Sequence, residues 1–193
     1  MLAPAMRTAL AIFLTTLALA TTADARDFGP TPGEVSPPWD GRTFRTMTDD
    51  VTGLSVDVPM HAFRFETRHF GTGLPAGRAT EAYTIYGPAG TEEVSIELFD
   101  DRDTLGLDGF FDRHLDFMAR NASIRRGSTI GVQKTPAIVI EQPSLPGSYA
   151  RVSAVFARGR RIVRVTCING ESDRAVAVYD RVLESISLRK AAR

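Results

Sequence analysis

The sequence predicts an α+β domain: an antiparallel β-sheet of about six to eight strands, with one mid-chain helix and one C-terminal helix packed on it. Three observations lead to this prediction. Apolar and polar residues alternate in several short segments, as in half-buried strands. Turn-forming residues join neighbouring segments, as in hairpins. Helical periodicity is confined to two segments, so nothing indicates the strand–helix–strand alternation of a parallel sheet.

Length and composition fit one globular domain with a tail. The chain has 193 residues, and 23 basic side chains balance 23 acidic ones. This zero net charge argues against a general nucleic-acid-binding protein, which needs a basic surface. The single cysteine excludes an intramolecular disulfide and any zinc or iron–sulfur site built from several cysteines.

Residues 1–25 resemble a secretory signal peptide. Arg7 precedes the apolar stretch 8–20, and Ala23-Asp24-Ala25 has the small residues of a cleavage site. The stretch is shorter than the ~20 apolar residues of a membrane-spanning helix, and no later segment is longer. We therefore expect a periplasmic or secreted bacterial protein that begins at Arg26 and has no transmembrane segment after cleavage. An uncleaved N-terminal anchor is the alternative.

Residues 26–52 are predicted to form an N-terminal tail rich in proline and glycine. Four prolines and three glycines lie between residues 29 and 41, where they disfavour regular structure. Trp39, the only tryptophan, lies in this stretch. It is either an aromatic anchor for a partner or a side chain that fixes the tail to the domain's own surface.

The predicted domain, residues 53–189, opens with strands. Leu54, Val56 and Val58 alternate with polar residues, and Phe63 and Phe65 do the same. Two further apolar segments, 82–86 and 94–99, flank Gly87-Pro88-Ala89-Gly90, which is typical of a hairpin with a slightly long loop.

The mid-chain helix follows these strands. Asp108 is the predicted N-cap, and the helix is expected to end near Asn121. One apolar stripe has helical spacing: Phe110, Phe111, His114, Leu115 and Met118.

The C-terminal part predicts strands and then a second helix. The apolar run 137–140 precedes two segments, 149–157 and 162–169, that bracket the turn Arg158-Gly159-Arg160. In the second segment Val163, Val165 and Cys167 share one face. A helix with Asp173 as its cap then places seven apolar residues on one side: Ala175, Val176, Val178, Tyr179, Val182, Leu183 and Ile186.

This order of elements resembles the Mog1/PsbP-like superfamily, which includes DcrB-type bacterial envelope lipoproteins. The resemblance rests on the opening strand Gly53–Pro59, the strands around Arg158-Gly159-Arg160, and the helix end Val182–Leu188. It implies a protein without enzymatic activity that binds other proteins as an adaptor, chaperone or assembly factor. Met60-His61 stands where the family often has an aromatic residue, and no lipoprotein cysteine is present.

No pattern of catalytic or metal-binding residues emerges. No serine lies in Gly-x-Ser-x-Gly, and the strand phase of Cys167 favours a buried core residue over a nucleophile. None of His61, His69 and His114 has a second histidine at metal-binding spacing. Asp101 and Asp103 partly match a calcium loop, but Leu105 occupies a ligand position, which favours a solvated turn. The sequence therefore predicts no catalytic residue, cofactor or metal ligand.

Arginines around the predicted hairpin turn are the candidate binding residues, together with Trp39. Arg158, Arg160, Arg161 and Arg164 could meet an anionic ligand, such as a phosphate or a lipid headgroup, or an acidic partner. A charged hairpin that protects a sheet edge is the alternative. We expect an adaptor that contacts another envelope protein. A small-molecule or lipid-binding domain and a hydrolase with a cryptic site are the other hypotheses.

Overall fold

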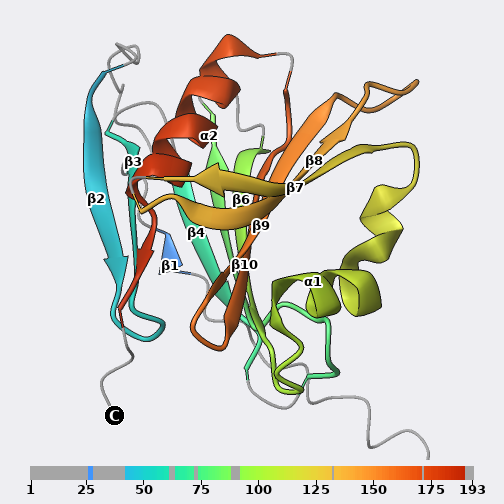
Figure 1. Ribbon diagram of the computed structural model, residues 1–193. Coiled ribbons are helices and arrows are strands. Elements are labelled where there is room, and N and C mark those ends of the chain that lie inside the picture. Colours follow the sequence, from blue (N-terminus) through green and yellow to red (C-terminus); the bar gives the residue numbers. More distant parts are fainter. Residues whose placement is uncertain are drawn as a thin grey trace, which may run out of the picture.

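The computed structural model describes residues 26–27, 42–60, 64–71, 74–87, 92–131, 133–170 and 172–189. The expected signal peptide, Trp39 and His61 lie outside these residues. The predicted α+β class is confirmed. An eight-stranded sheet and a three-stranded sheet are combined with a mid-chain helical segment and a C-terminal helix (Figure 1).

The large sheet has the order β1-β4-β5-β6-β10-β9-β8-β7, and each neighbouring pair is antiparallel. The predicted hairpins β5–β6 and β9–β10 are both present. The strands are β1 (Arg26–Asp27), β4 (Arg64–His69), β5 (Glu81–Tyr86), β6 (Glu92–Asp100), β7 (Ser123–Ile130), β8 (Thr135–Gln142), β9 (Arg151–Arg158) and β10 (Arg161–Cys167).

The small sheet corrects the predicted extent of the irregular tail. Strand β2 (Phe44–Asp49) lies within residues 26–52, and it pairs along its whole length with β3 (Leu54–Pro59). The polar residues of β2 give no apolar alternation, so its pairing with β3 defines it as a strand. The short β11 (Ser187–Leu188) covers the other edge of β3. Central strand β3 is therefore buried on both faces, and not half-buried as predicted.

The C-terminal helix α2 (Asp173–Ser185) packs on one face of the large sheet, beside the small sheet (Figure 1). The predicted N-cap of this helix, Asp173, is wrong by one residue. Ser172 is the N-cap, and its Oγ accepts a hydrogen bond from the backbone N–H of Ala175 at 3.3 Å. Asp173 is the first helical residue, where its negative charge favours the positive end of the helix dipole.

The mid-chain helical segment spans 106–119 and changes pitch twice. It consists of α1 (Gly106–Phe110), a π-helical turn (Phe111–Leu115) and a 3-10 turn (Asp116–Ala119). Asp108 is not its N-cap. Both carboxylate oxygens of Asp101 instead accept hydrogen bonds from the backbone N–H groups of Leu105 and Gly106, at 2.9 and 2.8 Å. Asp101 is thus buried, and the solvated turn predicted for it is wrong.

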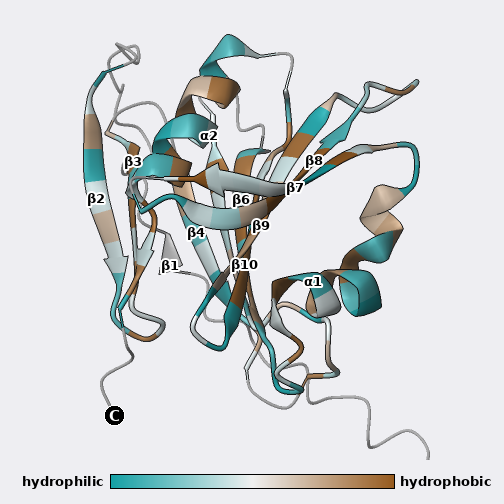
Figure 2. Ribbon diagram, in the orientation of Figure 1, coloured by the Kyte–Doolittle hydropathy of each residue, from teal (hydrophilic) through white to brown (hydrophobic). Residues whose placement is uncertain are grey.

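Two hydrophobic clusters cover the two faces of the large sheet. On one face, α2 and the small sheet pack against side chains such as Val163, Val165 and Cys167. On the other face, the helical segment 106–119 packs against the half formed by β8, β9 and β10. Hydrophobic residues concentrate on the central strands, whereas hydrophilic residues mark the outer side of α2 (Figure 2). Among the described residues, no helix covers the half of this second face that β4, β5 and β6 form (Figure 1).

Strand β7 forms one edge of the large sheet. Its register with β8 shifts between Arg125 and Ser128, where Gly127 has a φ of +73°. The side chain of Arg126 in this irregular stretch pairs with the carboxylates of Asp108 and Asp112, so it connects the edge strand to the helical segment.

Within the described residues, none of the helices has the length and apolar character that a membrane span requires.

Candidate functional site

An open groove lies on the half of the large sheet that carries no helix. The side chains of Ala82, Glu97, Phe99 and Arg164, from β5, β6 and β10, form its floor. The end of the helical segment 106–119 forms one wall, and Phe70 with the loop 74–79 forms the other. Its volume is about 690 Å³. We call it the aromatic groove.

Aromatic side chains on both walls stay exposed to solvent. Phe117 is 54% exposed and Phe70 is 39% exposed. His114 lies beside Phe110, with a ring-centroid distance of 4.9 Å, and also lines the groove. Large exposed hydrophobic side chains that line one groove are typical of a surface that binds another molecule.

A partly buried ion pair lies on the floor of the groove. Nε of Arg164 donates to Oε2 of Glu97 at 2.5 Å, and the side chains are only 17% and 22% exposed. The Arg164 guanidinium also lies 5.5 Å from the ring centroid of Phe99 and contacts the sulfur of Met118 at 3.1 Å. Arg164 is therefore held in place by contacts on several sides.

The four candidate arginines do not form one surface. Arg164 lies on the opposite face of β10 from Arg161, because successive residues of a strand point to opposite faces and these two are three positions apart. Arg161 donates to the backbone carbonyl of Thr52 at 3.3 Å, and Arg158 binds the side chain of Gln133. Arg160 is exposed in the turn between the strands. The turn groups these residues in sequence, but the strands separate Arg164 from the rest.

Cys167 is a buried core residue, as its strand phase predicts. It is free and fully buried among the side chains under α2. Burial raises the pKa of its thiol to about 11, despite a hydrogen bond at the backbone of Asn169 that acts in the opposite direction. A thiol with such a pKa is neutral at pH 7 and is a poor nucleophile.

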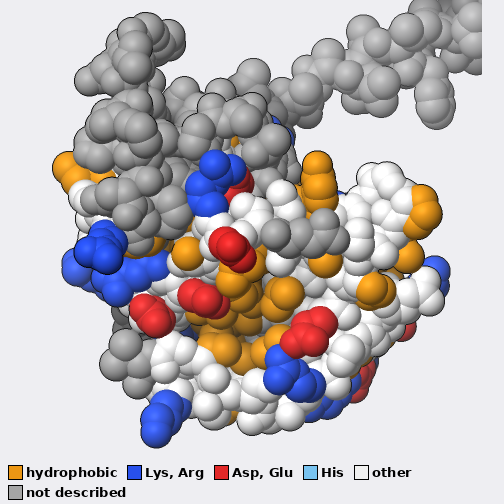
Figure 3. All heavy atoms as spheres, turned by 90° about the horizontal axis from the view of Figure 1, so that it is seen from above, with side chains coloured by type: hydrophobic (Ala, Val, Ile, Leu, Met, Phe, Trp, Pro, Cys, Tyr) orange, Lys and Arg blue, Asp and Glu red, His pale blue; other side chains and the backbone are white. Residues whose placement is uncertain are grey.

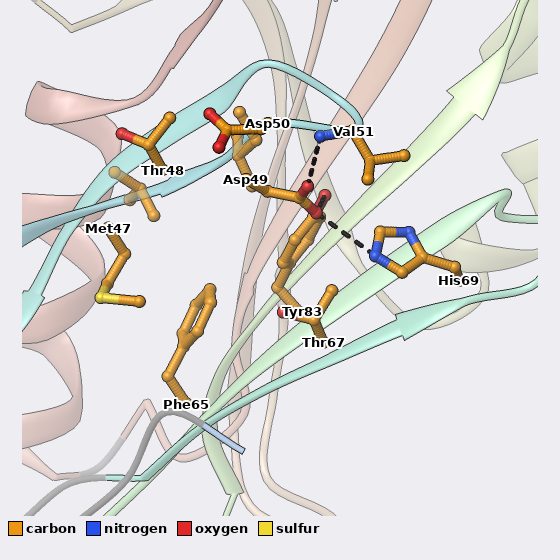
Figure 4. A pocket seen from close by; sticks show the side chains of 11 residues that line it. Met47, Thr48, Asp49, Asp50, Val51, Phe65, Thr67, His69 and Tyr83 are labelled. Atoms are coloured by element: carbon orange, nitrogen blue, oxygen red, sulfur yellow. Dashed lines mark hydrogen bonds and ion pairs between the residues drawn. The ribbon is translucent and has the colours of Figure 1, made fainter. Parts of the chain in front are cut away.

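His69 is the histidine that lies close to a carboxylate. Its Nε2 is 3.4 Å from Oδ2 of Asp49, at the edge of a pocket between the two sheets (Figure 4). The same Asp49 oxygen accepts a hydrogen bond from the hydroxyl of Tyr83 at 2.9 Å. A hydrolase with a cryptic site would need a histidine near a carboxylate, and this grouping supplies one. The sequence gives no sign of it, because the three residues are on separate strands at unrelated spacings.

Charges of both signs are mixed on the surface. On the face seen in Figure 3, hydrophobic side chains gather in the centre, and acidic and basic side chains surround them.

In the described part of the chain, no group of three or more His, Cys, Asp or Glu side chains is placed to hold a metal ion. Asp103 lies 3.6 Å from Arg113, and Asp101 caps the helical segment.

Comparison of the sequence with protein-family models and with curated proteins finds no match.

Proposed function

We propose that this protein is a non-enzymatic binding protein of the bacterial cell envelope, and that the aromatic groove receives an apolar side chain of a partner protein. The exposed Phe70 and Phe117, which line the same groove, are the observation that carries this proposal. Aromatic side chains that become buried on association supply much of the binding free energy of protein interfaces. The order of elements, which resembles the Mog1/PsbP-like superfamily, supports the same function.

The charges of the groove favour a partner segment that carries a carboxylate. Arg78 is exposed at the rim, and no carboxylate of the described residues lies within ion-pair distance of it. The Arg164 guanidinium on the floor is already paired with Glu97. An incoming carboxylate therefore meets Arg78, and the apolar part of the same segment lies between the two phenylalanines.

A small amphipathic carboxylate is a second candidate ligand. The volume of the groove, about 690 Å³, lies within the roughly 300–1,000 Å³ of typical small-molecule sites. It would bind through the same chemistry, with an apolar body between the aromatic walls and its carboxylate at Arg78.

Site-specific photocrosslinking in the native host tests the proposal. A photoreactive residue replaces Phe117 in one variant and Tyr149, which is 60% exposed outside the groove, in a matched control. We expect one protein to crosslink at position 117 and not at position 149. Arg78→Glu should reduce this crosslink at least fivefold, whereas Arg151→Glu, at an exposed residue of β9, should not.

Two outcomes contradict the partner-protein proposal. One is equal crosslinking from positions 117 and 149. The other is the absence of any protein at position 117, together with a carboxylate compound that native mass spectrometry detects in the purified protein. The second outcome supports the small-molecule candidate if Phe117→Ala removes the compound.

A further inference from the structure

A smaller pocket lies between the two sheets, where the turn after β2 meets β4 and β5. Its volume is about 170 Å³, and it shares no lining residue with the aromatic groove. Asp49, Thr67, His69 and Tyr83 group on one side of it, and Met47 and Phe65 lie on the other (Figure 4). We call it the Asp49 pocket.

Fixed hydrogen bonds hold the carboxylate of Asp49 at this pocket. Oδ1 accepts from the backbone N–H of Val51 at 2.8 Å, and Oδ2 accepts from the Tyr83 hydroxyl at 2.9 Å. Thr52 in turn lies 2.7 Å from the Tyr83 oxygen, so the tyrosine is bonded on both sides. Nε2 of His69 also lies 3.4 Å from Oδ2. A carboxylate has about four acceptor positions, so with these three neighbours Asp49 can accept one further hydrogen bond from a ligand.

Thr67 supplies a second polar group to the pocket. The residue is 2% exposed, and its Oγ1 has no hydrogen-bond partner among the described residues. A buried hydroxyl without a partner destabilises the folded protein, since it has lost its hydrogen bonds to water. A ligand that donates to Oγ1 removes this cost when it binds. The unpaired hydroxyl is therefore an observation that points to a ligand, independently of the acidic residues.

The rest of the pocket favours a compact cation with an apolar body. Of the described residues, Asp49 and Asp50 line it together with His69, and no lysine or arginine does so. Phe65 and Tyr83 are stacked with centroids 5.8 Å apart, and their rings offer an aromatic surface of the kind that attracts ammonium groups. Burial raises the pKa of Tyr83, and the charges of Asp49 and Glu81 raise it further. The electrostatic potential around the tyrosine hydroxyl is thus negative.

We propose that the Asp49 pocket binds a small primary amine. Its ammonium group donates to the Asp49 carboxylate and to Oγ1 of Thr67, and its apolar part contacts Phe65 and Met47. The size of the pocket limits the ligand to about the size of benzene, since a cavity of roughly 150 Å³ holds that molecule. A small-amine site is distinct from the partner surface of the aromatic groove, and either can exist without the other.

Binding of n-butylammonium, measured by calorimetry and by NMR shifts of the Thr67 methyl group, tests this proposal. Butan-1-ol and butanoate are the matched neutral and anionic probes. We expect the ammonium ion to bind at least tenfold more tightly than either probe. Equal binding of the three probes, or no binding of n-butylammonium, overturns the proposal.

Thr67→Val is the decisive variant, because it removes an unpartnered hydroxyl at nearly constant volume. It should leave the protein at least as stable as before, yet weaken n-butylammonium binding about tenfold. Thr84→Val is the matched control, since Thr84 follows Tyr83 on β5 and points to the opposite face of the sheet. Equal affinities of the two variants contradict the assignment. Asp49→Asn should weaken binding more strongly, and if it fails to fold, the Thr67→Val result decides.

Discussion

Arg164 on β10 lies directly opposite Glu97 on β6, and the two side chains form an ion pair on the floor of the aromatic groove. The pair is mostly screened from water by Phe99 and Met118. Removal of one partner of such a pair leaves a poorly solvated charge, which costs more than the pair contributes to stability.

Replacement of Arg164 should therefore destabilise the fold. We expect Arg164→Met to lower the free energy of unfolding by roughly 1–3 kcal/mol, because Glu97 keeps its charge without a partner. The double variant Arg164→Met/Glu97→Gln should recover part of this loss. Urea denaturation of the original protein, the single variants Arg164→Met and Glu97→Gln, and the double variant measures the coupling. A single variant as stable as the original protein would show that water already solvates Glu97.

Gly77→Ala should disturb both stability and the aromatic groove. Gly77 has a φ of +80°, and a Cβ there would lie 2.8 Å from Nδ1 of His114. Gly147 has a φ of +83° with open space around it, so Gly147→Ala carries the backbone cost alone, roughly 1 kcal/mol. Gly77→Ala should lose more than this control in thermal or urea unfolding. It should also reduce crosslinking at position 117, which Gly147→Ala leaves unchanged.

Ser172 and Asp173, neighbours at the start of α2, should contribute unequally to the free energy of unfolding. Ser172→Ala should lower the free energy of unfolding by roughly 1 kcal/mol, since its hydroxyl oxygen accepts from the N–H of Ala175. Asp173→Ala removes only a favourable charge–dipole interaction, so its cost should be roughly half as large. Urea denaturation at low salt compares them. A larger loss for Asp173→Ala would contradict the assignment of Ser172 as the cap.

Stability should fall at alkaline pH. Burial raises the pKa of Cys167 to about 11 and also raises the pKa values of Tyr83 and Tyr179. The unfolded chain loses these protons at lower pH than the folded protein, so stability present below pH 8.5 is lost as the pH rises. The Cys167 contribution is at most about 3 kcal/mol, at roughly 1.4 kcal/mol for each pKa unit.

Denaturation midpoints between pH 7 and 10.5 measure this effect. The original protein should begin to lose stability near pH 9, where the unfolded thiol ionises. Cys167→Ala should keep a constant midpoint until the unfolded tyrosines ionise near pH 10. If both proteins follow the same curve, the thiol makes no contribution to the alkaline transition.

The sequence predicts those elements whose own residues carry a clear period. The alternation of Val163, Val165 and Cys167 defines β10, and the helical spacing of seven apolar residues defines α2. Both elements bury one face completely, so packing and local pattern agree. The stripe from Phe110 to Met118 likewise gives the position of the mid-chain helical segment, but its π-helical turn leaves no trace in that spacing.

The edge strands β2 and β7 could not be predicted from the sequence, because they form by pairing with neighbouring strands and have no clear pattern of their own. Strand β2 has polar residues at three central positions, and β7 carries Arg125, Arg126 and Gly127. Their hydrogen bonds to β3 and β8 stabilise them, and no local pattern reports these long-range pairs.

The candidate sites depend on the tertiary structure in the same way. The meeting of Asp49, His69 and Tyr83 results from the packing of one sheet on another. Residues close in sequence can also lie on different surfaces: Arg164 is near Arg161 in sequence, but the two lie on opposite faces of β10.

The bulge of β7 also determines how copies of this protein meet one another in concentrated solution. A regular edge strand exposes a row of free N–H and C=O groups, onto which a second molecule can add its own strand and start an aggregate. At Gly127 this row is interrupted, because the register of β7 with β8 shifts there. The opposite edge strand, β1, pairs among the described residues only with Glu66 and Thr67 of β4. The irregular β7 edge is therefore a poorer template for intermolecular strand addition than a regular edge would be.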